Sequence, residues 1–182
     1  MTDILNFFIA AVLASCPLLF GTLGESLTEK SGNLNLGVEG MMFMGGVGGL
    51  AGALWYEGAV TAPIGAVAAL VAIVCSFLCA ALGALLYSVL TITLRANQNV
   101  TGLALTTFGV GLMKVIMSKM DATVYLVGPK MLYRWPFADR QDSLQCLGVL
   151  FFLAVIIALT AGWVLQHTKV GLHLCAVGEN PA

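Results

Sequence analysis

The chain has 182 residues, of which 59% are apolar and only 9% are charged, and its formal net charge is −1. Soluble domains contain about 25% charged residues, so this composition indicates an integral membrane protein. The charge gives no indication of a nucleic-acid partner, and no glycine-rich loop ends in the Lys-Ser/Thr pair that binds phosphate. The five cysteines have no metal-ligand spacing. We therefore expect no catalytic residues, no metal site and no cofactor in this chain.

Uncharged apolar runs predict five spanning helices, near residues 4–23, 37–55, 61–90, 99–119 and 144–166. A spanning helix needs about 20 apolar residues. The third run would be about 45 Å long as a helix, against a hydrocarbon core of about 30 Å. It must therefore tilt, project beyond the bilayer or break, and Pro63 and Gly65 favour a break near its start. The expected fold class is an all-α, polytopic bundle of transmembrane helices.

The second run is rich in small residues that recur every four positions. Gly45 and Gly49 are four residues apart, as are Gly48 and Gly52. Small residues at this spacing allow helix backbones to approach closely in lipid. We expect Gly45, Gly49 and Gly52 to pack against a neighbouring helix.

A polar stretch precedes the second run. Gly32, Asn33, Asn35 and Gly37 are poor residues for a helix interior, so they predict an interruption. With Asn35 as the cap of the next helix, Glu39 would lie in the first turn, where the helix dipole favours a carboxylate. Non-helical backbone at membrane depth is buried in protein or lines a wet cavity. Two interpretations stay open: a substrate pathway lined by Asn33, Asn35 and Glu39, or an ordinary interfacial loop before a capped helix.

A second polar cluster opens the fourth run. Asn97, Gln98 and Asn99 stand together, and Thr101 follows. Asn99 and Thr101 are further candidates for the pathway. The alternative is that threonine in a membrane helix bonds back to its own backbone.

The segment between the fourth and fifth runs, near residues 120–143, holds several charges and aromatic residues. Its aromatic side chains suit either membrane anchoring or docking of a partner. With five spans, four positive charges lie on the side of this loop and three on the other side. The positive-inside rule would thus place the loop in the cytoplasm, by a single charge.

The chain closes with Asn180 and Pro181, a capping side chain followed by a proline suited to the first helical position. A helix is expected to begin where the sequence ends. We therefore expect the chain to be the N-terminal part of a longer protein.

Three segments carry a resemblance to a known family. GTLGESLTEKSGNLNLGVEGMMFMGG (residues 21–46) resembles the early segment of permease subunits of bacterial ABC importers, in the nucleoside and simple-sugar branch of a broad family that includes ribose and branched-chain amino acid permeases. The family's polar turn, G-x-L-N-L-G-x-E-G, matches residues 32–40. LRANQNVTGLALTTFGVGL (residues 94–112) is similar to a second family segment.

TKVGLHLCAVGENPA (residues 168–182) is similar to the family's cytoplasmic loop that leads into the coupling helix on the ATPase. The resemblance places five residues in this ATPase-coupling loop: Gly171, Gly178, Glu179, Asn180 and Pro181. One departure is Cys175, where relatives usually carry arginine. A cytoplasmic loop here would put residues 120–143 outside the cell, against the charge count.

The resemblance implies the N-terminal part, residues 1–182, of one transmembrane permease domain in the bacterial inner membrane, ending at the start of the coupling helix. Its function would be import of a nucleoside or simple sugar by alternating access. The implied partners are cytoplasmic ATPase subunits that bind the ATP, a second permease subunit, an extracytoplasmic solute-binding protein and the lipid bilayer. The alternatives are a branched-chain amino acid permease, whose corresponding turn usually lacks the glutamate, and an ATPase-independent secondary transporter or channel. No residue identifies the substrate.

Overall fold

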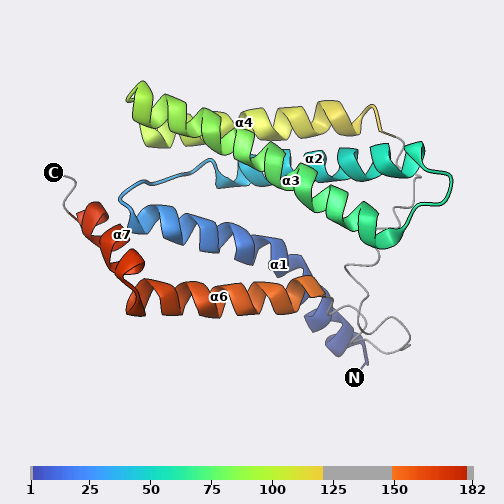
Figure 1. Cartoon of the computed structure of the whole chain (residues 1–182), viewed down its shortest axis with the longest axis horizontal. Coiled ribbons are helices and arrows are strands. Elements are labelled where there is room, and N and C mark those ends of the chain that lie inside the picture. Colours follow the sequence, from blue (N-terminus) through green and yellow to red (C-terminus); the bar gives the residue numbers. More distant parts are fainter. Residues whose placement is uncertain (1, 121–148, 180–182) are drawn as a thin grey trace. The chain divides into compact units, whose positions relative to one another are not determined.

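The computed structural model describes residues 2–120 and 149–179, and every regular element within them is a helix. In chain order the elements are α1 (Thr2–Lys30), α2 (Val38–Ala59), α3 (Gly65–Ser88), the π-helix η1 (Val89–Thr93), α4 (Gln98–Met117), α6 (Val149–His167) and α7 (Lys169–Glu179) (Figure 1). The expected all-α fold class is confirmed. Most of the expected aromatic loop, from residue 121 onward, lies outside the described residues.

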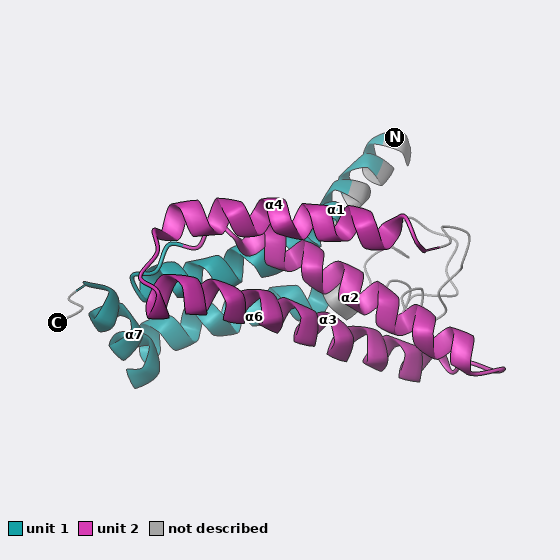
Figure 2. Ribbon diagram, turned by 90° about the horizontal axis from the view of Figure 1, so that it is seen from above, with its two compact units in different colours: residues 1–34, 132–182 teal, residues 35–131 magenta. Residues whose placement is uncertain are grey.

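The helices belong to two compact units (Figure 2). Unit 1 comprises residues 1–34 and 132–182 and contains α1, α6 and α7. Unit 2 comprises residues 35–131 and contains α2, α3, η1 and α4. The assignment of the whole chain to one transmembrane permease domain stays a prediction.

Helices occur at all five segments that the sequence predicts to span the membrane. Among the described residues, two helices are long and apolar enough to cross a bilayer: Gly65–Thr93 and Gln98–Met117. A third is added if the bent pair Phe151–His167 and Lys169–Glu179 forms one broken span. The helical membrane bundle is thus supported, and the count of five spans stays a prediction.

The third predicted span begins with the expected break. Helix α2 ends at Ala59, and α3 begins at Gly65, so Pro63 lies in the connection between them. From Gly65 to Thr93 the helix runs for 29 residues, or about 44 Å, which still exceeds the hydrocarbon core. Its last five residues form a π-helix, and Arg95 follows with a φ of 53°, so the helix ends in an irregular turn.

Small residues of α2 and α3 form the closest contact between these two helices. A Cβ added at Gly45 would lie 3.2 Å from the Cβ of Ala80, and one added at Gly49 would lie 3.0 Å from the Cβ of Ser76. Gly52 lies against Cys75. All three glycines that the sequence suggested for packing therefore lie in the contact between α2 and α3, where a larger side chain would push the backbones apart.

Helix α1 of unit 1 ends in a Schellman motif. The Asn33 N–H donates to the Thr28 carbonyl at 3.1 Å, and the Gly32 N–H donates to the Glu29 carbonyl at 2.9 Å. Gly32 has a φ of +82°, the left-handed conformation that this motif requires at that position. A Cβ at Gly32 would also lie 3.1 Å from the Cα of Gly178 in α7. The turn is therefore closed both by its own hydrogen bonds and by packing.

The segment expected to be the ATPase-coupling loop forms a helix over Lys169–Glu179, and its part in ATPase coupling stays a prediction. The Thr168 hydroxyl accepts a hydrogen bond from the Gly171 N–H at 3.3 Å, as an N-cap does. Gly171 is buried against the backbone of Leu165, and the axes of α6 and α7 differ by 73°. Glu179 is the last residue of α7, and Asn180 and Pro181 lie outside the described residues.

We expect the Gly32→Ala substitution to destabilise the chain by about 1 kcal/mol or more, because alanine is strained at positive φ and its Cβ would meet Gly178. Gly24→Ala is the matched control in the same unit. Gly24 is inside α1 with nothing within 4 Å of an added Cβ, so alanine should stabilise the helix by up to about 1 kcal/mol. Denaturant titration followed by far-ultraviolet circular dichroism measures both. Equal effects of the two substitutions would contradict this account of the turn.

Candidate functional site

The interruption between α1 and α2 is the feature from which the candidate site is built. Helix α1 ends at Lys30 and α2 begins at Val38, so the predicted break is confirmed. The N-cap of α2 is Gly37, so the prediction that Asn35 caps it was wrong. Instead, the Asn35 Oδ1 accepts the Gly37 N–H at 2.9 Å, an Asx turn that competes with capping. Glu39 does lie in the first turn of α2.

Helices α2 and α4 approach each other through glycines just after the break, near the start of α2. A Cβ at Gly40 would lie 2.7 Å from the Cα of Thr106, and one at Gly109 would lie 2.7 Å from the Cα of Gly40. Distances below 3.0 Å essentially never occur for real Cβ atoms. Backbone therefore packs directly on backbone here, and only glycine fits at these two positions without moving a helix.

The same approach continues into the break itself. A Cβ at Gly102 of α4 would lie 2.9 Å from the backbone nitrogen atoms of Leu36 and Gly37. The Thr106 hydroxyl is shared between the Leu36 carbonyl at 3.0 Å and the Gly102 carbonyl at 3.2 Å. A polar group of the non-helical backbone is thus paired by α4, as membrane-buried irregular backbone requires. Thr106 makes a contact between segments, whereas Thr107 bonds only back to its own helix.

The five residues proposed for the substrate pathway differ in their surroundings. Asn35 and Thr101 are buried, with 6% and 8% of their surface exposed, whereas Glu39 and Asn99 are exposed. These four belong to unit 2. Asn33 belongs to unit 1, and its buried Oδ1 has no hydrogen-bond partner among the described residues. The structure therefore places Asn35 and Thr101 in the interior of unit 2 and Glu39 and Asn99 on its surface.

Asn97 is the side chain that organises the start of α4. Its Oδ1 accepts hydrogen bonds from the N–H groups of Asn99, at 3.0 Å, and Val100, at 3.3 Å. These are the contacts of an N-cap. The polar cluster at the start of α4 is therefore partly explained by capping through Asn97, and the pathway role of Asn99 stays a prediction.

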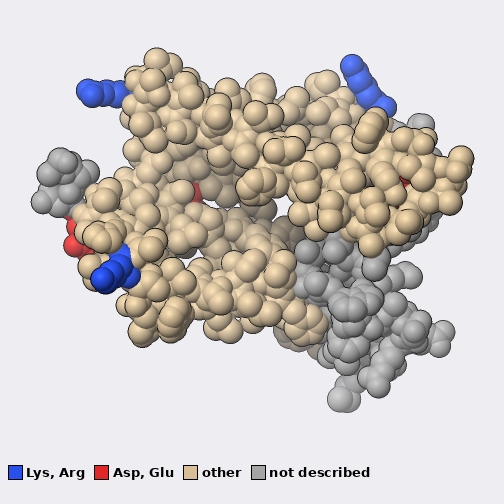
Figure 3. Space-filling view, in the orientation of Figure 1, with Lys and Arg blue, Asp and Glu red and all other residues tan. Residues whose placement is uncertain are grey.

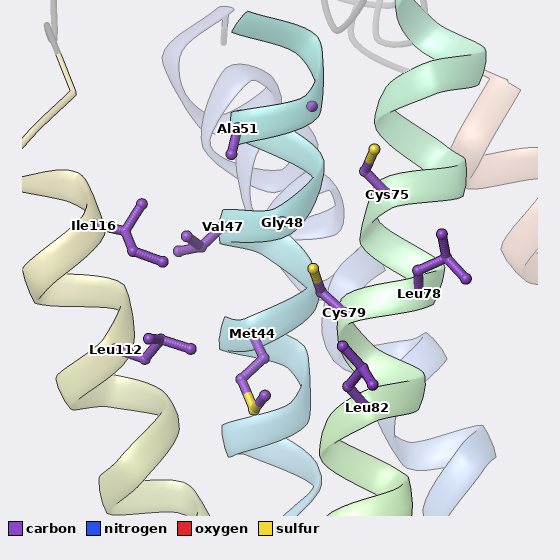
Figure 4. Close-up of a pocket in the computed structure, with 11 residues that line it drawn as sticks. Met44, Val47, Gly48, Ala51, Cys75, Leu78, Cys79, Leu82, Leu112 and Ile116 are labelled. Carbon is purple, nitrogen blue, oxygen red and sulfur yellow. The ribbon is translucent and has the colours of Figure 1, made fainter. Parts of the chain in front are cut away.

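A cavity of about 450 Å³ opens in unit 2 between α2, α3 and α4 (Figure 4). Its lining is almost wholly apolar, and the labelled side chains include Met44, Leu82, Leu112 and the thiols of Cys75 and Cys79. None of the proposed pathway residues lines it. An apolar wall offers no hydrogen bonds to a polar solute, so this cavity is not the proposed pathway.

The described surface carries little charge. On the face that Figure 3 shows, uncharged atoms cover nearly all of it, and few Lys, Arg, Asp or Glu side chains appear. Large apolar side chains on α3 are open, including Phe77 at 73% and Leu70 at 63% exposure. Lipid is the surrounding that suits such a surface. Within the described residues, no group of three or more His, Cys, Asp or Glu side chains is placed to hold a metal ion.

Sequence reasoning missed the contact between α2 and α4. Gly102 and Gly109 were not singled out, although they are seven residues apart and so lie on one face of α4. The available signal for a helix contact was a pair of small residues two turns apart, with Thr106 between them. That signal does not name the helix that packs there.

The model of a family described as the permease component of the branched-chain amino acid transport system matches residues 7–182. A candidate glucose ABC transporter permease of Haloferax volcanii is 34% identical over 94% of this chain and 51% of its own length. A guanosine ABC transporter permease of Bacillus subtilis and a nucleoside ABC transporter permease of Lactococcus lactis are 27% and 28% identical over the whole chain and 58% of their own lengths. The chain thus spans between half and three-fifths of the length of these curated relatives. No solved structure matches.

Thr106→Val should destabilise unit 2 by about 1 kcal/mol, because valine keeps the shape of threonine but cannot donate the hydrogen bond that the Leu36 carbonyl accepts. Thr107→Val is the matched control one residue later and should change the free energy of unfolding by less than half as much, since its hydroxyl bonds only within α4. Unfolding in a detergent-denaturant series measures both variants. An equal loss of stability in the two variants would contradict a stabilising hydrogen bond from Thr106 to the Leu36 carbonyl.

Proposed function

This chain belongs to the family of permease components of the branched-chain amino acid transport system, and we propose that it is part of the membrane-spanning subunit of an ABC importer for a nucleoside or simple sugar. The observation that carries the proposal is the family match over residues 7–182, which includes both the break before α2 and helix α7. The chain is a membrane protein. Its transport activity, its substrate and its partners belong to the proposal.

The choice of a nucleoside or sugar rests on the names of the relatives. They are described as permeases for glucose, guanosine and nucleosides. A branched-chain amino acid permease is the second candidate, because the family description names that solute class. Glu39 lies exposed in the first turn of α2. It supports the first candidate through the resemblance described above, in which the turn of the amino acid permeases usually lacks the glutamate.

The proposed pathway runs beside the break between α1 and α2. Non-helical backbone at membrane depth is tolerated where it lines a solute path or is buried in protein. The Asn33 Oδ1 is buried without a partner among the described residues, so it is a candidate acceptor for a solute hydroxyl or N–H group. Asn35 uses its Oδ1 to close the turn, so its proposed role is to fix the shape of the pathway. Glu39, Asn99 and Thr101 remain further candidates for its lining.

Alternating access would then require ATPase subunits, which bind the ATP, together with a second permease subunit and an extracytoplasmic binding protein. Residues 168–182 are proposed to face the cytoplasm, with Gly171 holding α7 against α6, Gly178 holding it against α1, and Glu179, Asn180 and Pro181 leading toward the ATPase. The segment near 120–143 would then face outward. The proposed location is the bacterial inner membrane, with several spans.

Uptake of labelled substrate into vesicles that contain the permease, its ATPase and its binding protein tests the proposal. We expect uptake that needs hydrolysable ATP and that unlabelled nucleoside or glucose competes away, while leucine does not. Uptake without ATP would favour a secondary transporter or channel. Competition by leucine alone would favour the amino acid permease.

The Asn33→Ala variant tests the pathway separately. We expect a several-fold rise in KM for uptake, because one hydrogen bond to the solute contributes about 1 kcal/mol, with little loss of stability, because the Oδ1 has no hydrogen-bond partner among the described residues. Ser118→Ala is the control. Its exposed hydroxyl bonds only within its own helix end, so KM should not change. An unchanged KM in Asn33→Ala would remove this residue from the pathway.

A further inference from the structure

Helix α7 packs on the other helices of unit 1 through one narrow face. Gly171, Leu174, Cys175 and Gly178 are its more buried residues, at the i, i+3, i+4, i+7 spacing of one helical face. Gly171 lies on the backbone of Leu165 at the end of α6, and Gly178 lies against the Lys30 carbonyl at the end of α1. This face therefore covers the ends of two helices of its own unit.

The rest of α7 is exposed and has two kinds of surface. Lys169 and His173, four residues apart, form a polar ridge opposite the packed face. Val170 and Val177 lie beside this ridge on one flank, because they are seven residues apart, and they are 72% and 57% exposed. Leu172, on the other flank, is 70% exposed. Glu179, seven residues after Leu172, is exposed on that second flank, so the flank of Val170 and Val177 is the apolar one. An apolar flank beside a polar ridge is the pattern of a helix lying in a membrane interface.

The end of α6 provides a second observation. Trp163 is 60% exposed, one helical turn before α6 ends, and its ring stacks on His167 at 5.8 Å between centroids. Leu159, a turn earlier on the same face, is 70% exposed. An open tryptophan between an apolar surface and polar residues is typical of the membrane–water interface. The exit of α6 from the hydrocarbon is thereby assigned to this turn.

The angle between α6 and α7 sets how far α7 advances along the axis of α6. With 11 residues it is about 16 Å long. At 73° to α6 it advances only about 5 Å along the α6 axis. The headgroup region of one leaflet is about 5–7 Å thick. For an α6 that crosses along the bilayer normal, α7 thus runs nearly parallel to the membrane surface, just beyond the turn at which α6 leaves the hydrocarbon.

We propose that α7 is an interfacial helix that lies on the lipid surface, with the apolar flank of Val170 and Val177 in the boundary between headgroups and acyl chains and the ridge of Lys169 and His173 facing water. Lipid is proposed to contact this flank, because the flank begins where the exposed apolar surface of α6 ends. The proposal rests on the membrane crossing of α6, not on the solute carried.

Spin labels at single cysteines test this placement in the whole chain, in a background with the five native cysteines replaced by alanine. The labels go to Val170→Cys and Val177→Cys, with His173→Cys as the matched control on the polar ridge. All three sites are exposed, so the label should not disturb packing, and circular dichroism checks the helix content of each variant. The chain is reconstituted in phosphatidylcholine vesicles, without an ATPase or a binding protein.

The measurement is the ratio of collisions with oxygen, which concentrates in lipid, to collisions with a water-soluble nickel chelate. We expect this ratio to be several-fold higher at positions 170 and 177 than at 173. Equal, water-like ratios at all three positions would overturn the proposal. Protection from the chelate that arises only after an ATPase subunit is added would also overturn it, in favour of a protein-docking surface. Neither outcome depends on transport, so failure here is distinct from failure of the proposed function.

Discussion

The direct contact of backbone with backbone between α2 and α4, at Gly40 and Gly109, is the constraint on which unit 2 depends. No side chain separates the helices there, so α4 comes close enough for Gly102 to meet the backbone of Leu36 and Gly37. That closeness also brings the Thr106 hydroxyl to the Leu36 carbonyl. The irregular backbone before α2 can exist in an apolar protein because α4 lies close enough to pair it.

Two different devices therefore hold the two sides of the break. On the α1 side, the Schellman motif at Gly32 is local and needs only a residue that accepts positive φ. On the α2 side, the contact with α4 is tertiary and needs several glycines at once.

Local signals made part of this predictable. Helix-poor residues predicted the break, and glycines four apart indicated close packing before any partner was known. The first-turn position of Glu39 was predicted with Asn35 as the cap, and it also holds with Gly37 as the cap. The cap was assigned wrongly because the Asn35 Oδ1 could either cap α2 or accept the Gly37 N–H in an Asx turn. In the structure it forms the Asx turn, and Gly37 is the N-cap. The pairing of Gly40 with Gly109 joins residues 69 positions apart, which no local pattern specifies. Helix α7 was not predicted, because the resemblance describes this segment only as a cytoplasmic loop that leads into a helix.

A double-mutant cycle between Gly40→Ala and Gly109→Ala tests the α2–α4 contact most directly. Each substitution alone should destabilise the chain by about 1–3 kcal/mol, because its Cβ meets backbone that cannot give way. Once one Cβ has separated the helices, the second should cost less, so the free energies of unfolding should be coupled by about 1 kcal/mol or more. Strictly additive costs would mean that the two glycines do not share one contact, and the close approach of α4 could then not be what supports the irregular backbone before α2.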